Sequence, residues 1–325
     1  MRKQMLTTAG ERIAIDCDLP WVDELINEAT AGERRDADAE RATLAVRVES
    51  SSRPFHTTAW EPVTRGAWRR AKEVVLEDVC GSGFDLRLAS GAERMDFTYR
   101  WRPKLRGQVV ARLLPSRFIL LARAALLQYP AMWRASLRDR APLHASVCTA
   151  GDLRPLLAGP GGVGKSTLLM QEIADGGVAI CDNICVSDGS TAWGLVEPVR
   201  VEGGSGRAMP HGRVERQLAR RVPALVPDII VSLRRSEDSV AVVKPCDPAT
   251  AARSLITGTF IAGELRRYWS FAATLTAATG LGPAQAPVEE IAEHLAARLP
   301  AVEIVLPNRP GLRLSELLNR VEAIA

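Results

Sequence analysis

The feature that most constrains this chain is the segment at residues 159–167, Gly-Pro-Gly-Gly-Val-Gly-Lys-Ser-Thr. It fits the pattern G-x-x-x-x-G-K-[ST] at every defined position, and its glycines allow the backbone to turn N–H groups inward around phosphate oxygens. A predicted strand at residues 153–157 precedes it, and an apolar stretch with helical spacing at residues 168–173 follows. The segment therefore predicts a strand, a phosphate-binding loop (P-loop) and a helix whose positive end faces the phosphate, as in α/β folds.

Two side chains of this segment have predicted roles in binding ATP and Mg²⁺. Lys165 would reach the β- and γ-phosphates, and the hydroxyl of Ser166 would be a ligand of Mg²⁺. The loop backbone would hold the phosphate oxygens. The predicted nucleotide-binding residues are Gly159, Gly161, Gly162, Val163, Gly164, Lys165, Ser166 and Thr167.

A carboxylate follows the loop after a short interval. Residues 178–181, Val-Ala-Ile-Cys, predict a strand that ends at Asp182. An Asp at that place would hold Mg²⁺ or accept the proton of an attacking hydroxyl, so Asp182 is a candidate catalytic residue and metal ligand. The alternative is a polar residue that only ends a strand. The chain contains neither an Asn-Lys-x-Asp guanine-reading sequence nor a Leu-Ser-Gly-Gly-Gln transporter sequence.

The order of the predicted elements indicates three regions. Residues 1–105 read as a mixed α/β domain with strands at 12–18 and 44–48, a helix starting at Pro20, and a hairpin of residues 84–88 and 95–99. Residues 106–135 form a predicted helical connector, in which the helix is expected to end near Pro130. Residues 136–325 are the predicted catalytic domain. Its predicted strands lie at 143–148, 153–157, 178–181, 229–233 and 302–306, and its predicted helices at 248–255, 264–278 and 288–299.

Composition excludes several other classes of protein. Hydrophobic residues make up 46% of the chain and charged residues 25%, with a net charge of +4, which argues against disorder and gives no reason to expect nucleic acid as a partner. No apolar run reaches the roughly 18 residues of a membrane helix, and the N-terminus lacks the apolar core of a signal peptide. The six cysteines form no paired framework. We therefore expect a cytoplasmic protein with reduced thiols.

The order of these motifs resembles the HPr kinase/phosphorylase superfamily, which is related in fold to phosphoenolpyruvate carboxykinase. The resemblance covers residues 135–310 and depends on Leu-His-Ala-Ser at 143–146, the P-loop at 159–167 and Val-Ala-Ile-Cys-Asp-Asn at 178–183. Within the superfamily it is greatest to kinases encoded with peptide natural-product pathways, such as those of lasso-peptide precursors. It implies a P-loop-containing core of a mixed sheet flanked by helices.

The resemblance also implies roles for single residues. His144 would lie close to the reacting phosphate and orient it or the catalytic carboxylate. Asp182 lies where the family often has two consecutive acids, but here its neighbours are Cys181 and Asn183, so which acid it replaces stays open. The family's Pro-Gly-Arg-Asn segment, linked to phosphorolysis, is not visible in this chain, which favours a one-way kinase.

The predicted function is transfer of the γ-phosphoryl group of ATP to a hydroxyl, most simply a Ser or Thr of a peptide or small protein, with the N-terminal domain recruiting the acceptor. One alternative is a small-molecule kinase acting on a sugar, cyclitol or natural-product alcohol. Another is a nucleotide-gated regulator without transferase activity. A homo-oligomer is compatible with all three. Arg200, Arg207 and Arg213 flank a Gly-rich stretch and would either approach the triphosphate or lie on solvated surface, the second being the simpler interpretation.

Overall fold

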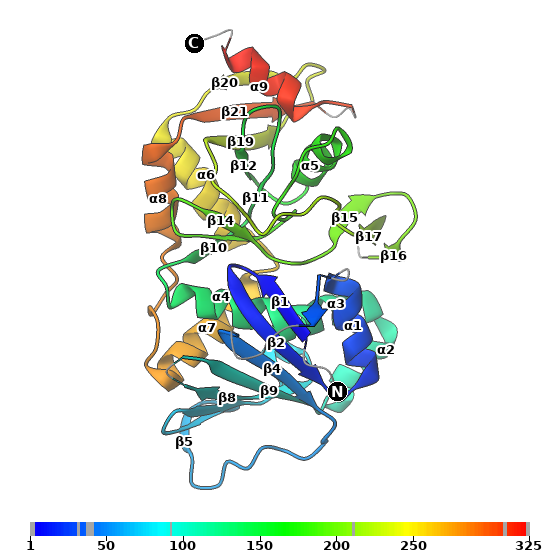
Figure 1. Ribbon diagram of the computed structural model, residues 1–325, viewed down its shortest axis with the longest axis vertical. Helices are drawn as coiled ribbons and strands as arrows, with labels where there is room; N and C mark the ends of the chain where they lie inside the picture. The colour runs from blue at the N-terminus through cyan, green and yellow to red at the C-terminus, as the bar shows by residue number, and fades with distance from the viewer. Residues whose placement is uncertain are drawn as a thin grey trace. The chain divides into compact units, whose positions relative to one another are not determined.

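The computed structural model describes residues 4–30, 33–36, 42–91, 93–209, 212–307 and 311–322. The chain has an α/β fold built from several sheets and flanking helices, as predicted (Figure 1). It divides into two compact units. Unit 1 comprises residues 1–138, 208–212 and 267–285, and unit 2 comprises residues 139–207, 213–266 and 286–325.

Unit 1 is built on a nine-stranded sheet with the strand order β3-β1-β2-β4-β9-β8-β7-β6-β5. Strands β2, β4 and β9 run parallel, and the other neighbours are antiparallel. Alternation along each strand separates two faces, so that Leu44, Val46 and Val48 are fully buried while Arg47 between them is exposed. The strands are β1 Gln4–Thr8, β2 Glu11–Cys17, β3 Arg35–Asp36, β4 Leu44–Glu49, β5 Glu61–Thr64, β6 Ala67–Arg70, β7 Glu73–Leu76, β8 Phe84–Ser90 and β9 Met95–Trp101.

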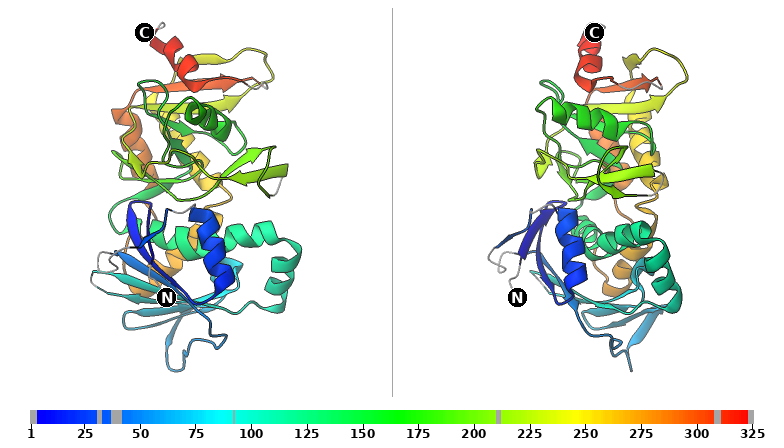
Figure 2. Two further views of the ribbon diagram at one scale, coloured as in Figure 1. Left: turned by 45° about the vertical axis from the view of Figure 1, so that its right-hand side comes forward. Right: turned by 90° about the vertical axis from the view of Figure 1, so that its right-hand side faces the viewer.

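Helices cover the apolar face of this sheet (Figure 2). Phe97 meets Trp133 edge to face at 6.2 Å between ring centroids, and the hydroxyl of Tyr99 donates to the carbonyl of Ala125 at 2.7 Å. The other face of the sheet carries most of its charged side chains. The helical segments are α1 Pro20–Thr30, η2 Val79–Gly81, α2 Leu105–Leu113, α3 Pro115–Arg123, the π-helical turn η3 Ala124–Gln128, α4 Tyr129–Ser136 and α7 Arg266–Thr279.

Unit 2 contains a five-stranded sheet of order β11-β12-β19-β21-β20, in which β12, β19 and β21 are parallel. Helices α5 and α9 share a buried cluster with one face of this sheet, and α6 and α8 lie on the other side (Figure 1). Burial on both faces explains why residues 229–233 are apolar except at Ser232. The elements are β11 Ala145–Val147, β12 Pro155–Ala158, α5 Lys165–Ala174, β19 Ile229–Arg235, β20 Val242–Pro245, α6 Pro248–Ile261, α8 Val288–Arg298, β21 Ala301–Leu306 and α9 Leu314–Glu322.

Two smaller sheets complete the description. One has the strand order β10-β13-β14-β18, and the other has the order β15-β17-β16. Their strands are β10 Ala141–Leu143, β13 Cys185–Ser187, β14 Ala192–Gly194, β15 Val199–Glu202, β16 Arg207–Ala208, β17 Arg213–Arg216 and β18 Ala224–Leu225.

Three predicted elements differ from the structure. Residues 178–181 form no strand: Ala179 makes only isolated bridges to Cys148 and Arg221, and the next strand begins at Cys185. A run of buried apolar residues looks the same in the sequence whether or not the segment pairs with neighbouring strands, which explains the error. Residues 143–148 form two strands in two different sheets, separated at His144. The predicted helix end near Pro130 is also wrong.

Pro130 lies in the first turn of α4, and the chain stays helical to Ser136. The π-helical turn η3 directly before it changes the hydrogen-bonding register, so the missing N–H of proline interrupts no helix. The hairpin of β8 and β9 and the helix starting at Pro20 are confirmed.

The unit boundaries differ from the predicted ones at 105/106 and 135/136. The helical connector belongs to unit 1, as do residues 267–285 from the C-terminal part of the sequence. The reason is packing, because Tyr268 and Phe271 of α7 each lie 5.7 Å from Tyr129 between ring centroids. Among the described residues, no helix has both the length and the apolar character needed to cross a membrane.

Candidate phosphate-binding site

The loop at residues 159–164 connects β12 to α5, so the predicted order of strand, loop and helix is confirmed. Gly159 has a φ of 143°, and a Cβ at this position would lie 2.8 Å from the carbonyl oxygen of Leu233. Only glycine therefore allows the loop to pass this close to β19. Gly164, with a φ of 114°, precedes the first residue of α5. The loop thus ends at a helix N-terminus, where N–H groups are available to an anion.

Lys165 is buried and folds back over the loop. Its Nζ donates to the carbonyl oxygens of Gly159 at 2.7 Å and Pro160 at 3.2 Å. Burial lowers the pKa of Lys165 to about 8, although the charges of Asp182 and Glu264 act in the opposite direction. A phosphate would replace the two carbonyl oxygens with acceptors of full negative charge, so this ammonium group is placed to exchange them for a nucleotide.

Asp182 is the most deeply buried carboxylate of the site. Burial raises its pKa, opposed by a hydrogen bond from the hydroxyl of Ser166 and by the positive charges of Arg200 and Lys165. Its Oδ1 atom is buried and has no hydrogen-bond partner among the described residues. A buried carboxylate oxygen without a partner costs free energy, and such atoms in native proteins commonly indicate a missing ion or ligand.

The residues at this point fit Mg²⁺. The hydroxyl of Ser166 and the carboxylate of Asp182 are adjacent hard oxygen donors, and one oxygen of Asp182 has no partner among the described residues. Mg²⁺ prefers such ligands, and it commonly takes only one or two from the protein and the rest from water and phosphate. Ser166 and Asp182 are therefore suited to hold the ion next to the loop.

His144 lies where β10 passes into β11, and α6 holds it in place. Its backbone N–H donates to the hydroxyl of Thr259 at 3.0 Å, its Nδ1 lies 3.1 Å from the carbonyl oxygen of Gly258, and its Nε2 lies 2.9 Å from the side chain of Asn183. Burial, followed by the positive charge of Lys165, lowers the pKa of His144 to about 4. The ring is therefore neutral at pH 7.

A neutral imidazole has one N–H, and this restricts how His144 bonds. The carbonyl of Gly258 can only accept, so Nδ1 carries the proton and Nε2 accepts. The structure places Oδ1 of Asn183, also an acceptor, 2.9 Å from Nε2, and exchanging the amide oxygen and nitrogen of Asn183 gives this contact its donor. His144 thus contacts the residue next to Asp182, and its direct contacts with side chains do not include Asp182 itself.

Several residues of the site carried no clear signal in the sequence. Arg200 does not lie on solvated surface, so the simpler interpretation of this residue is wrong. Its guanidinium is largely buried and donates to Glu264 at 2.9 Å, and its positive charge lowers the pKa of Asp182. Arg213 and Arg235 come close to the loop, with Arg235 donating from Nε to the carbonyl of Val163 at 3.3 Å. Such residues follow no motif, because strands and helices far along the chain bring them here.

Comparisons with known proteins do not assign the chain to a family. No protein-family model matches the chain, and no curated protein matches it. Among solved structures, the Hpr(Ser) kinase/phosphatase from Coxiella burnetii aligns at 13% identity over 56% of this chain and 88% of that chain, with a TM-score of 0.28. A likeness at this TM-score carries no argument about function. The interpretation of the site therefore depends on its own residues.

Nucleotide affinity is expected to fall as the pH rises above about 8, because the ammonium form of Lys165 is the form that binds phosphate. With a pKa of about 8 in the free protein, each further pH unit should weaken binding about tenfold until the pKa of the complex is reached. The measurement is the Kd for ATP with saturating Mg²⁺ from about pH 7 to about pH 9.5. The Lys165→Ala variant is the control and should give a flat profile; the same slope in both proteins would contradict the assignment.

Proposed function

We propose that this chain is an ATP- and Mg²⁺-dependent kinase that transfers the γ-phosphoryl group to a hydroxyl. The observation that supports it most directly is the buried carboxylate of Asp182, with one oxygen lacking a partner among the described residues, beside Ser166 and within the electrostatic influence of Lys165. A P-loop alone supports nucleotide binding. A carboxylate in this position adds a group that can act on a second reactant.

In the proposed mechanism most of the catalysis is positioning and charge neutralisation, as is usual for phosphoryl transfer. Lys165 leaves the carbonyls of Gly159 and Pro160 and binds phosphate oxygens. Ser166 and Asp182 would hold Mg²⁺, which would supply positive charge next to the triphosphate. The acceptor hydroxyl oxygen bonds to the γ-phosphorus, the bond from that phosphorus to the bridging oxygen breaks, and ADP leaves.

The acceptor proton goes to Asp182 in this mechanism. Its raised pKa brings its basicity nearer to the working pH, which improves a carboxylate as a proton acceptor. His144 is a positioning residue: neutral and fixed by α6, it holds Asn183 and with it the turn that carries Asp182. Arg200, paired with Glu264, keeps a positive charge near the developing negative charge.

The acceptor that we propose is a Ser or Thr of a peptide or small protein, following the resemblance stated above. A small-molecule alcohol is the second candidate on the same residues, since the chemistry at the γ-phosphate would be identical. A nucleotide-gated regulator that hydrolyses ATP poorly is the third. Only the identity of the labelled product separates them.

The test is transfer of γ-labelled phosphate from ATP into a size-fractionated extract of the cells from which the protein comes. Label in a peptide or protein fraction, absent with Asp182→Asn and present with Asp238→Asn, is the expected result. Asp238 is exposed in the loop after β19, so Asp238→Asn makes the same chemical change as Asp182→Asn at an exposed position. Label only in small molecules would select the second candidate, and no label anywhere would contradict kinase activity and leave the regulator.

A further inference from the structure

The charged face of the nine-stranded sheet in unit 1 carries two hollows. The register places Asp16, Arg47, Thr98 and Arg87 in one row across β2, β4, β9 and β8. Side chains that alternate with these, such as Val46 and Phe97, are buried on the other face. The sheet therefore exposes its polar side chains on a face separate from its apolar core.

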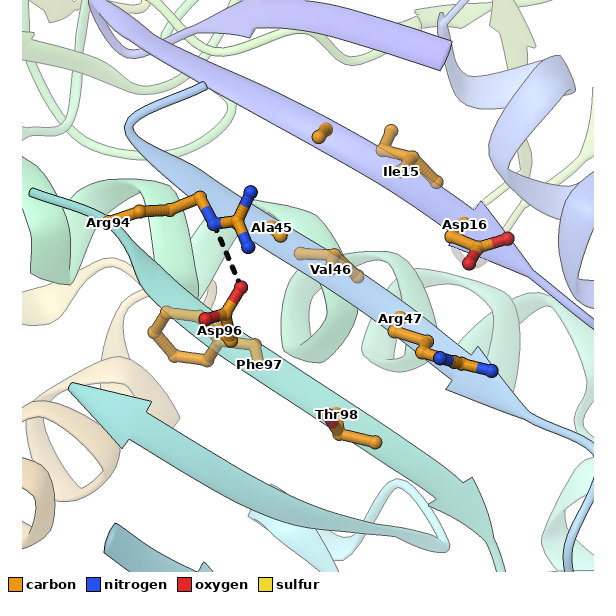
Figure 3. A pocket seen from close by; sticks show the side chains of 10 residues that line it. Ile15, Asp16, Ala45, Val46, Arg47, Arg94, Asp96, Phe97 and Thr98 are labelled. Atoms are coloured by element: carbon orange, nitrogen blue, oxygen red, sulfur yellow. Dashed lines mark ion pairs between the residues drawn. The ribbon is translucent and has the colours of Figure 1, made fainter. Parts of the chain in front are cut away.

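The first hollow, of about 260 Å³, lies over β2, β4 and β9 (Figure 3). Its charges balance, because Arg47 and Arg94 stand with Asp16 and Asp96, and Arg94 is paired to Asp96 at 3.0 Å. It has a shallow floor of small side chains. Nothing in this charge pattern selects a ligand.

The second hollow, of about 530 Å³, lies at the other end of the same face and is strongly basic. Its lining contains four arginines from the loop after β4 and from strands β6, β8 and β9, but only one acid, Glu73. A further acid, Glu49, pairs with Arg100 at 2.7 Å from outside the lining. The charged residues of the lining are Arg53, Arg70, Arg87, Arg100 and Glu73.

Aromatic rings hold two of these guanidinium groups. The guanidinium of Arg70 lies 4.9 Å from the ring centroid of Trp60, and that of Arg100 lies 4.2 Å from the ring centroid of Phe55. Stacking on a ring fixes the plane of a guanidinium and leaves its N–H groups in the plane able to donate. In Arg100 these groups already donate to Glu49 at 2.7 Å and to the carbonyls of Arg53 and Pro54 at 3.2 Å, so this arginine contributes mainly positive charge to the hollow. Arg53 is exposed, and its guanidinium has no partner among the described residues.

The ion pairs of Glu73 within the lining indicate that carboxylates suit this hollow. Glu73 forms an ion pair with Arg87 and receives Arg70 at 3.9 Å, so guanidinium groups from two strands converge on one carboxylate. Arg53 adds an exposed guanidinium to the same lining. The lining thus already binds one carboxylate and has donors for more.

We propose that this basic hollow binds an acidic peptide segment through its carboxylates. Its volume exceeds that of a single oxyanion, and its arginines are spread over a loop and three strands, so that carboxylates at several positions of one segment find a positive charge. Planar carboxylates match the paired N–H groups of arginine. The inference concerns unit 1 and goes beyond the proposed kinase activity, on which it does not depend.

The test is fluorescence anisotropy of the full-length protein with two labelled peptides of the same length. One alternates Asp and Glu with Gly and Ser, and the other has Asn and Gln in place of the acids. We expect the acidic peptide to bind at least about tenfold more tightly than the amide peptide and to weaken as salt rises. Equal binding of the two peptides would overturn the proposal.

Substitutions in and near the lining test whether the acidic peptide binds in the basic hollow. Arg53→Gln combined with Arg70→Gln should weaken the acidic peptide at least about tenfold, and Arg65→Gln, an exposed arginine of the same unit outside the lining, should change it less than about twofold. Glu73→Gln removes the internal competitor and should tighten binding by about threefold or more, a gain that a folding defect does not produce. Unchanged binding in the double variant, or weaker binding in Glu73→Gln, would overturn the site. Binding of a labelled single-stranded oligonucleotide, with no binding of the acidic peptide, would instead assign the hollow to phosphates.

Discussion

Asp182→Asn is expected to lower phosphoryl transfer by about a thousandfold or more while ATP affinity stays within about tenfold. The amide keeps the volume of the side chain, but it neither holds Mg²⁺ as a carboxylate does nor accepts a proton. Binding should change less, because in the proposed site Lys165 and the loop make the main contacts to the phosphates. Steady-state transfer and calorimetric Kd values, measured on the same preparations, separate the two effects.

The stability of the same variant provides an independent readout. A carboxyl whose pKa is raised in the folded state lowers stability at neutral pH, since unfolding releases it to ionise freely. The thermal midpoint of Asp182→Asn without nucleotide should therefore equal or exceed that of the unmodified protein. Full transfer activity in a stable Asp182→Asn protein would contradict the mechanism.

Lys165→Ala is expected to weaken ATP binding and transfer together. The ammonium group would contact phosphate in both the ground state and the transition state, so its loss raises the Kd by about ten- to a hundredfold, or roughly 1.4 to 2.7 kcal/mol. Transfer at saturating ATP should also fall at least about a hundredfold. Calorimetry with ATP and Mg²⁺ measures the first effect, and single-turnover transfer measures the second.

The matched control for Lys165→Ala is Lys72→Ala, which removes an exposed lysine in unit 1. It should leave affinity and transfer unchanged. A Lys165→Ala protein that binds ATP as tightly as the control would show that the loop holds no phosphate, and the proposed function would lose its nucleotide site.

Local elements of the site could be predicted because their signals are local. The P-loop pattern placed β12, the loop and α5 correctly, since the positive φ angles of Gly159 and Gly164 are a local property of the loop that glycine adopts readily. The strand predicted at residues 178–181 failed for the opposite reason. An apolar run shows that residues are buried, but a ladder needs partner strands that the run does not specify.

The amino-acid sequence by itself determined the α/β class and the order of strand, loop and helix, and it contains the residues proposed to bind phosphate and Mg²⁺. These depend on side-chain chemistry and on short-range periodicity. Tertiary structure alone decided the state of those residues: the neutral ring of His144, whose Nδ1 lies against the carbonyl of Gly258 at a separation of 114 residues, and the buried oxygen of Asp182. The protonation state and the hydrogen-bond partners of a residue depend on its desolvation and on charges that folding brings close. The residues that cause these effects lie far away in the sequence, so a local pattern does not reveal them.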